Sequence, residues 1–137
     1  MKLRAISIIG LLLAVLVACQ SEDQLEFKRY YTSGTVIYQG KCQNCHGDKG
    51  EGLSALIPPL TDSVYLKANK QQLACMVKYG LNKPIKVAGK AFYSQMPLND
   101  LPPVEIAEVL TYITNSFGNK MGVVTTQMVE DDLKGCR

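Results

Sequence analysis

The segment 41–50, KCQNCHGDKG, contains two cysteines, Cys42 and Cys45, separated by two residues and followed at once by His46. His46 is the one histidine of the 137-residue chain. Two thiols and an imidazole this close together are typical of a redox, metal or cofactor site. The use of these three side chains therefore decides both the fold and the function.

A thioredoxin-like dithiol is one possible use, and it requires the two cysteines to lie between a strand and a helix. The residues before the motif show no strand-like alternation. Gly34, Ile37 and Tyr38 instead fall at helical spacing toward Cys42. The local pattern therefore disfavours a thioredoxin-like site.

Zinc, a simple disulfide and haem are the other three uses. A zinc site needs four ligands and would have to recruit Cys75 or Cys136. Adjacent Cys45 and His46 are also an awkward pair for one tetrahedron. A disulfide between Cys42 and Cys45 gives His46 no role. In covalent haem attachment both thiols add to the porphyrin vinyl groups and the histidine becomes an iron ligand, so we predict one haem c per chain.

Met96 is the predicted second axial ligand of this haem. Six-coordinate haem iron usually takes Met or His as its second ligand, and the chain has no second histidine. Met96 follows His46 by fifty residues and is followed by Pro97 in a predicted loop. The alternative is that Met96 is a gap-filling core methionine like Met76 or Met128, but its place in a loop beside Pro97 favours the ligand role over those two.

These features resemble the class I c-type cytochromes, and the resemblance runs from about residue 31 to residue 119. In that family a glycine and an aromatic residue, eight and four residues before the first haem cysteine, pack against the C-terminal helix. Gly34 and Tyr38 occupy these positions. Val109 and Tyr112 match the family's contact pair on the partner helix.

The resemblance also implies the arrangement around the iron. Cys42 and Cys45 would hold the haem, and His46 and Met96 would be its axial ligands. The carbonyl of a proline would accept the imidazole proton, and Pro58 or, as an alternative, Pro59 would supply it.

The expected fold is all-α, a cytochrome c-like helical domain wrapped around haem, with no sheet. A helix is predicted over residues 69–80, capped by Asn69 with Gln72 and closed by Gly80. A second helix begins at Pro102 and Pro103 and stops near Gly118. Its apolar face consists of Ile106, Val109, Leu110, Ile113 and Phe117.

The N-terminus has the layout of a secretory signal, with Lys2 and Arg4 before an apolar run that ends at Ala18. Residues 16–19, Leu-Val-Ala-Cys, resemble the cleavage box of bacterial lipoproteins, so we expect removal of residues 1–18 and lipidation of Cys19. Residues 19–29 would then be a polar tether. The protein would be exported and held on a bacterial membrane, facing the periplasm.

Residues 30–119 form the predicted cytochrome c domain, and residues 120–137 form an extension. Thr125 can cap a short helix in the extension, and Gly135 can close it. Cys75 and Cys136 are left over after haem attachment and lipidation. In an oxidising compartment they would form a disulfide, with a redox-sensing thiol pair as the alternative.

Six lysines and no acidic residue lie between Asp62 and Asp100. Part of this stretch would border the exposed haem edge, so we expect Lys83, Lys86 and Lys90 to form a docking rim for an acidic redox partner. An ordinary solvated lysine surface is the alternative. Nucleic acid is disfavoured as a partner by the acylated, exported location.

With both axial positions filled by protein, haem exchanges single electrons and does not readily bind small ligands. We therefore expect a membrane-tethered electron carrier between respiratory redox partners, not an enzyme. Two alternatives remain: a haem enzyme or sensor with an open sixth position, and a fixed relay subunit of a larger respiratory complex.

Overall fold

The computed structural model describes residues 22–136 of the chain. The predicted signal and the predicted lipidation site, Cys19, lie outside the described residues. Within residues 22–136, no helix combines the length and the apolar character needed to cross a membrane.

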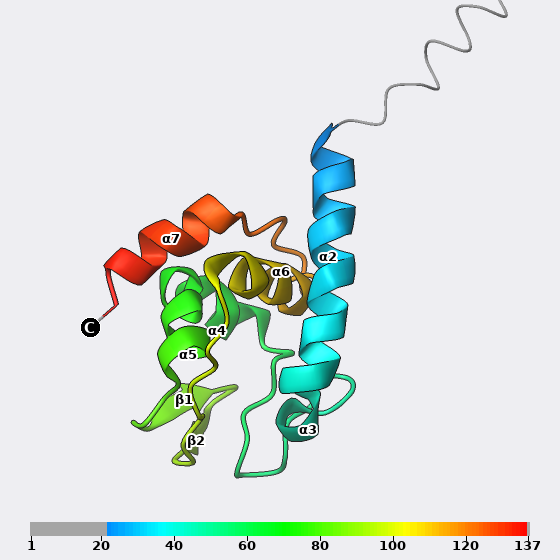
Figure 1. Ribbon diagram of the computed structural model, residues 1–137. Helices are drawn as coiled ribbons and strands as arrows, with labels where there is room; N and C mark the ends of the chain where they lie inside the picture. The colour runs from blue at the N-terminus through cyan, green and yellow to red at the C-terminus, as the bar shows by residue number, and fades with distance from the viewer. Residues whose placement is uncertain (1–21, 137) are drawn as a thin grey trace, which may run out of the picture.

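Two crossing helices form the frame of the fold (Figure 1). Helix α2 (Glu22–Lys41) packs against α6 (Pro103–Ile113). Gly34 lies at the crossing, where a Cβ atom would collide with the backbone carbonyl of Glu108 and crowd Tyr112. The close approach of the two helix axes therefore requires glycine at this position.

Helix α2 begins before residue 30, the predicted start of the domain. Residues 22–29, expected as part of a polar tether, form its first two turns. Glu22 and Asp23 lie in the first turn, where acidic side chains favour a helix N-terminus. The helical part of the chain therefore begins well before residue 30.

Helix α6 ends at Ile113, earlier than the predicted end near Gly118. The side chain of Asn115 explains the early end. Its Oδ1 accepts hydrogen bonds from Met121 N at 3.0 Å and Gly122 N at 2.9 Å. These bonds turn the chain back toward the helix, and Phe117 takes a left-handed φ of 57° in the turn.

The predicted helix over residues 69–80 is divided in the structure. Helix α4 (Ser63–Ala68) precedes a 3₁₀ turn, η1 (Lys70–Gln72), and helix α5 (Leu73–Tyr79) follows. The expected capping by Asn69 is wrong, because its Nδ2 donates backward to the Tyr65 carbonyl at 2.9 Å. Gly80, with φ of 75°, closes α5 as predicted.

The expectation of no sheet is also wrong. Strands β1 (Ile85–Val87) and β2 (Lys90–Phe92) form an antiparallel hairpin. Val87 and Phe92 are buried and anchor the hairpin to the domain. The rest of the described chain is helical or irregular, so the fold is mostly helical with one small hairpin.

The C-terminal extension packs onto the domain as helix α7 (Thr126–Lys134). The Thr125 hydroxyl accepts from Met128 N at 3.3 Å, so the predicted cap is present. Val129 is fully buried, and Cys136 forms a disulfide with Cys75 of α5. The extension is therefore joined to the domain by both apolar packing and a covalent bond.

Candidate haem site

The Cys-x-x-Cys-His motif folds as a short helix, α3 (Gln43–His46), directly after α2. His46 N donates to the Cys42 carbonyl at 2.9 Å, and Cys45 N donates to the same carbonyl at 3.1 Å. This tight backbone turn places both thiols and the imidazole within little more than one helical turn. Cys42 is half-buried, Cys45 is exposed, and His46 is buried.

Both motif cysteines are free thiols in the structure. Burial raises the pKa of the Cys42 thiol to about 11, and the charge of Cys45 adds to the effect. The attacking cysteine of a Cys-x-x-Cys redox site instead has a depressed pKa. The raised pKa of Cys42 thus differs from the depressed pKa of the attacking thiol in a thioredoxin-like site.

His46 is held by the carbonyl of Pro58, whose oxygen lies 3.2 Å from Nδ1. A carbonyl only accepts, so Nδ1 carries the proton and Nε2 keeps its lone pair for a metal. Burial lowers the pKa of His46, and the bond to Pro58 partly offsets this effect. The ring is therefore neutral at pH 7, as an iron ligand must be.

The loop after His46 comes close to Pro58 because of Gly52. This glycine has a φ of 70°, and a Cβ atom there would collide with the carbonyl of Ile57 and crowd Pro58. A further bond, from Gly52 N to the His46 carbonyl at 2.8 Å, links the loop to α3. The proline carbonyl is thus fixed beside the imidazole.

Met96 lies at the base of the segment that contains the hairpin. Its N–H donates to the Leu81 carbonyl at 2.8 Å, and Leu81 N donates to the Met96 carbonyl at 2.9 Å. Gly80 allows this pairing, because a Cβ at position 80 would collide with the Met96 carbonyl. The backbone of Met96 is therefore tightly constrained.

His46 and Met96 line the same two small cavities, of about 80 and 70 Å³. Cys42 and Pro58 line the larger of the two, and Cys45 and Pro58 line the smaller. The larger cavity is otherwise almost entirely apolar. Its other walls come from α4, α5, α6, β1 and the loops before α4 and after α5: Pro59, Leu60, Tyr65, Leu66, Leu73, Met76, Val77, Leu81, Ile85, Val87, Leu110 and Ile113.

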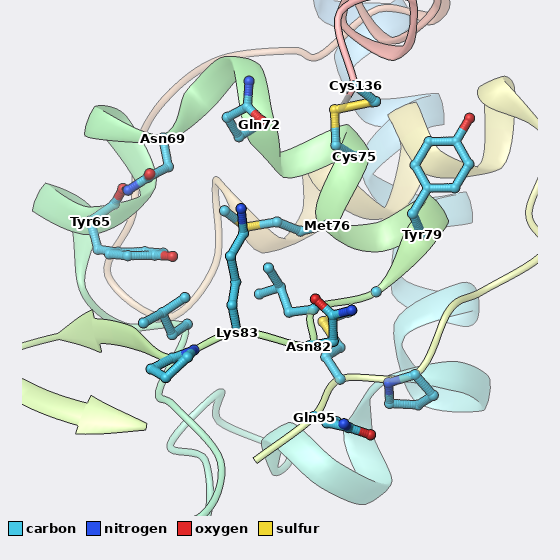
Figure 2. Close-up of a pocket in the computed structure, with 16 residues that line it drawn as sticks. Tyr65, Asn69, Gln72, Cys75, Met76, Tyr79, Asn82, Lys83, Gln95 and Cys136 are labelled. Atoms are coloured by element: carbon cyan, nitrogen blue, oxygen red, sulfur yellow. A yellow bond between two sulfur atoms is a disulfide. The ribbon is translucent and has the colours of Figure 1, made fainter. Parts of the chain in front are cut away.

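A larger open groove of about 930 Å³ adjoins these cavities and shares Leu81, Ile85 and Met96 with both. Figure 2 shows the groove, with the disulfide at one edge and the side chain of Lys83 projecting into it. Among the described residues that line the three spaces, Lys83 is the one cation and none is acidic. Two thiols, a neutral imidazole, a thioether and an apolar lining are the groups that a covalent haem requires.

Residues 30–113 match the family model described as "Cytochrome C oxidase, cbb3-type, subunit III". This match covers more than half of the chain. The chain belongs to the class I c-type cytochromes. Members of this family carry covalently bound haem c, so haem c is the cofactor of this cytochrome.

Two curated proteins are similar to this cytochrome, and both are named cytochrome c-552. The one from Thermus thermophilus is 31% identical over 91 residues, which cover 63% of this chain and 69% of that protein. The other, from a particular strain of the same species, is also 31% identical over 91 residues, but these cover 61% of its length. The similarity to the second protein therefore covers less than two thirds of that protein.

The structure brings five of the sequence-predicted residues of this c-type cytochrome to one place. These residues line the two small cavities: Cys42, Cys45, His46, Pro58 and Met96. Of the predicted docking lysines, Lys83 lies at the cavities, whereas Lys86 and Lys90 lie on the hairpin strands.

Sequence reasoning missed three features of the site. Leu81 pairs with Met96, Met76 lines the larger cavity and the groove, and the hairpin forms one wall. The alternation in Ile-Lys-Val and Lys-Ala-Phe around Ala88 and Gly89 was a hairpin signal. No local pattern indicates the pairing of Leu81 with Met96.

Proposed function

We propose that this c-type cytochrome carries single electrons between membrane-associated redox proteins, with His46 and Met96 as its axial iron ligands. The observation that carries the proposal is that His46, fixed by Pro58, and Met96, fixed by Leu81, line the same cavities. Cys42 and Cys45 hold the cofactor covalently. When bound, haem c supplies one-electron exchange between ferric and ferrous iron.

The chain's own residues prepare the site for this task. Pro58 keeps the proton on Nδ1 of His46 and so directs Nε2 to the iron. The apolar lining excludes water, which favours the less charged ferrous state. Thioether ligation by Met96 acts in the same direction and raises the reduction potential.

Visible spectra of the ferric and ferrous holoprotein test the ligation. We expect a low-spin spectrum with a methionine-to-ferric-iron band that Met96→Ala abolishes. Met128→Ala is the matched control, because Met128 is 44% exposed on α7 and should leave the band unchanged.

Met76→Ala tests which of the two methionines that line the larger cavity, Met76 or Met96, binds the iron. Loss of the band in Met76→Ala, with retention in Met96→Ala, would assign the ligand to Met76 instead. A high-spin wild type that binds carbon monoxide readily would indicate an open sixth position and the chemistry of an enzyme or sensor.

The membrane tether rests on the sequence alone, on the lipobox-like residues 16–19. Acylation of Cys19 would hold the exported protein at a bacterial membrane, since each buried methylene contributes about 0.8 kcal/mol. Replacement of residues 1–19 by a secretory signal that is cleaved without lipidation should release the holoprotein into the soluble periplasmic fraction. Continued membrane association of this variant would contradict the tether.

The family description favours a second form of the same function. A subunit of an oxidase relays electrons within an assembly and does not dissociate, whereas the name cytochrome c-552 refers to no such assembly. Extraction in mild detergent distinguishes the two. Stoichiometric co-purification with other subunits indicates a fixed relay, and isolation of the cytochrome alone indicates a shuttle.

A further inference from the structure

The segment 81–96 is a closed loop that leads to Met96. The two hydrogen bonds between Leu81 and Met96 join its ends, and strands β1 and β2 continue from this base to the tip at Ala88 and Gly89. The whole hairpin thus extends from the backbone pair that contains the proposed iron ligand.

The turn at the tip of the hairpin contains Ala88, a residue that disfavours the backbone conformation it adopts there. Ala88 has a φ of 49° and Gly89 a φ of 77°, so both turn residues are left-handed. Such two-residue turns strongly prefer asparagine or glycine at the first position, because a Cβ without a polar group is disfavoured there. The conformation of Ala88 therefore needs support from outside the hairpin.

Asp62 provides this support from the start of α4. Its Oδ2 accepts from Ala88 N at 2.8 Å, while Oδ1 accepts from Val64 N at 3.0 Å and Tyr65 N at 3.2 Å. One carboxylate thus caps a helix and binds the hairpin tip. The bonds from Tyr65 N and then Ala88 N hold the pKa of Asp62 below its ordinary value.

The two elements that Asp62 joins are two walls of the haem cavity. Tyr65 and Leu66 line it from α4, and Val87 lines it from β1. A rotation of the hairpin away from α4 would therefore open the cavity and strain the Leu81–Met96 pair at its base.

We propose that Asp62 is a positioning residue for Met96, which keeps the loop 81–96 closed against α4 and so holds the methionine at the iron. The inference rests on the proposed ligation by His46 and Met96. Asparagine at position 62 has a single acceptor oxygen and can either cap α4 or bind Ala88, but not both.

Imidazole titration of the ferric holoprotein tests this role. Imidazole replaces methionine only when the loop opens, so its apparent affinity reports the open fraction. Loss of one hydrogen bond to a carboxylate should raise the apparent affinity in Asp62→Asn about tenfold. Asp131→Asn, an exposed position on α7 remote from the loop, is the matched control and should leave it unchanged.

A second substitution separates the bond to α4 from the conformation of the hairpin turn. In the Asp62→Asn background, Ala88→Asn creates the favoured Asn-Gly turn but restores no bond to α4, so the imidazole affinity should stay raised. A return to the wild-type affinity would show that Asp62 acts on the turn alone and would overturn closure against α4. Asp62→Ser retains a helix-capping hydroxyl but is too short to reach Ala88, so it should behave like Asp62→Asn.

Hydrogen exchange completes the test. We expect faster exchange of the Ala88 amide in both Asp62 variants. Faster exchange with unchanged imidazole affinity would show that Asp62 holds the hairpin without positioning Met96, and would overturn the proposal. Absence of a methionine-to-iron band in the wild type would refute the ligation itself and the positioning role with it, so the wild-type spectrum distinguishes the two failures.

Discussion

Gly34 of α2 packs directly against the backbone of Glu108 in α6, with no room for a Cβ atom between them. Around this contact Tyr38 packs on Tyr112, with ring centroids 5.1 Å apart. The hydroxyl of Tyr38 donates to the Gly47 carbonyl at 2.6 Å, one residue beyond His46. The helix crossing is thus linked to the haem site through one aromatic side chain.

Gly34→Ala should destabilise the protein by about 1–3 kcal/mol, because the new methyl group forces the two helices apart. Gly40→Ala is a matched control in the same helix. A Cβ at Gly40 meets no atom within 4 Å, and alanine is the better helix former, so this variant should gain about 0.5–1 kcal/mol. Urea unfolding monitored by circular dichroism measures both; equal effects in the two variants would contradict the close contact.

Substitution of both motif cysteines, Cys42→Ala with Cys45→Ala, should abolish covalent attachment of the cofactor. Haem should then be extracted by acidified organic solvent, whereas it remains with the denatured wild-type chain. Each single variant retains one thiol and should keep one thioether, as mass spectrometry of the intact protein can show. Haem that stays with the denatured double variant would disprove attachment through these residues.

Cys136→Ser should lower stability through loss of the disulfide to Cys75, which closes a sequence separation of 61 residues. The chain-entropy relation gives about 4 kcal/mol for a loop of this length. Thermal unfolding of the wild type and variant measures the difference, and Cys75→Ser is the matching variant. If peptide mapping of the non-reduced protein found both cysteines alkylatable, the bond would be absent in solution.

Neutralising Lys83, Lys86 and Lys90 to glutamine should weaken the ionic-strength dependence of electron transfer with an acidic partner, because steering depends on these charges. Lys78 should not contribute in this way, since it pairs with Asp100 at 2.9 Å and donates to the Leu101 carbonyl. Lys120→Gln, on the connection between α6 and α7, is the control. Stopped-flow rates across a salt series give the slope, and an unchanged slope in the triple variant would place docking elsewhere.

The hydrogen bonds of the Asp62 carboxylate should make part of the free energy of unfolding sensitive to acid. Its pKa is lowered in the folded protein, so the stabilisation is fully present above the ordinary value of 3.8 and is lost as the pH falls through the folded value. Urea midpoints between about pH 6 and 3 should therefore fall less steeply in Asp62→Asn than in the wild type. Parallel curves for the two proteins would argue against the depressed pKa.

The features that the sequence predicted correctly depend on local patterns. Helical spacing of Gly34 and Tyr38 before the motif predicted α2, and Thr125 predicted the start of α7. The Cys-x-x-Cys-His motif is five residues long, so the cofactor could be predicted from it without knowledge of the fold. The same logic identified Gly80 as the end of α5.

The features that it missed depend on partners far along the chain. The bond from Ala88 to Asp62 spans 26 residues, and it stabilises a turn whose first residue is a poor turn former. Asn115 ends α6 through bonds to residues six and seven positions later. Neither partner can be identified from helical periodicity or from single-residue propensity.

The four cysteines of the described domain impose opposite demands on its maturation. Cys42 and Cys45 must reach the cofactor as thiols, whereas Cys75 and Cys136 are joined by oxidation. An oxidant that forms the second pair can also join the first, which lies within a single helical turn and needs no folded domain to meet. Production of holoprotein therefore depends on a reductant that keeps Cys42 and Cys45 as thiols until the thioethers form. An excess of that reductant would also reduce the disulfide between Cys75 and Cys136.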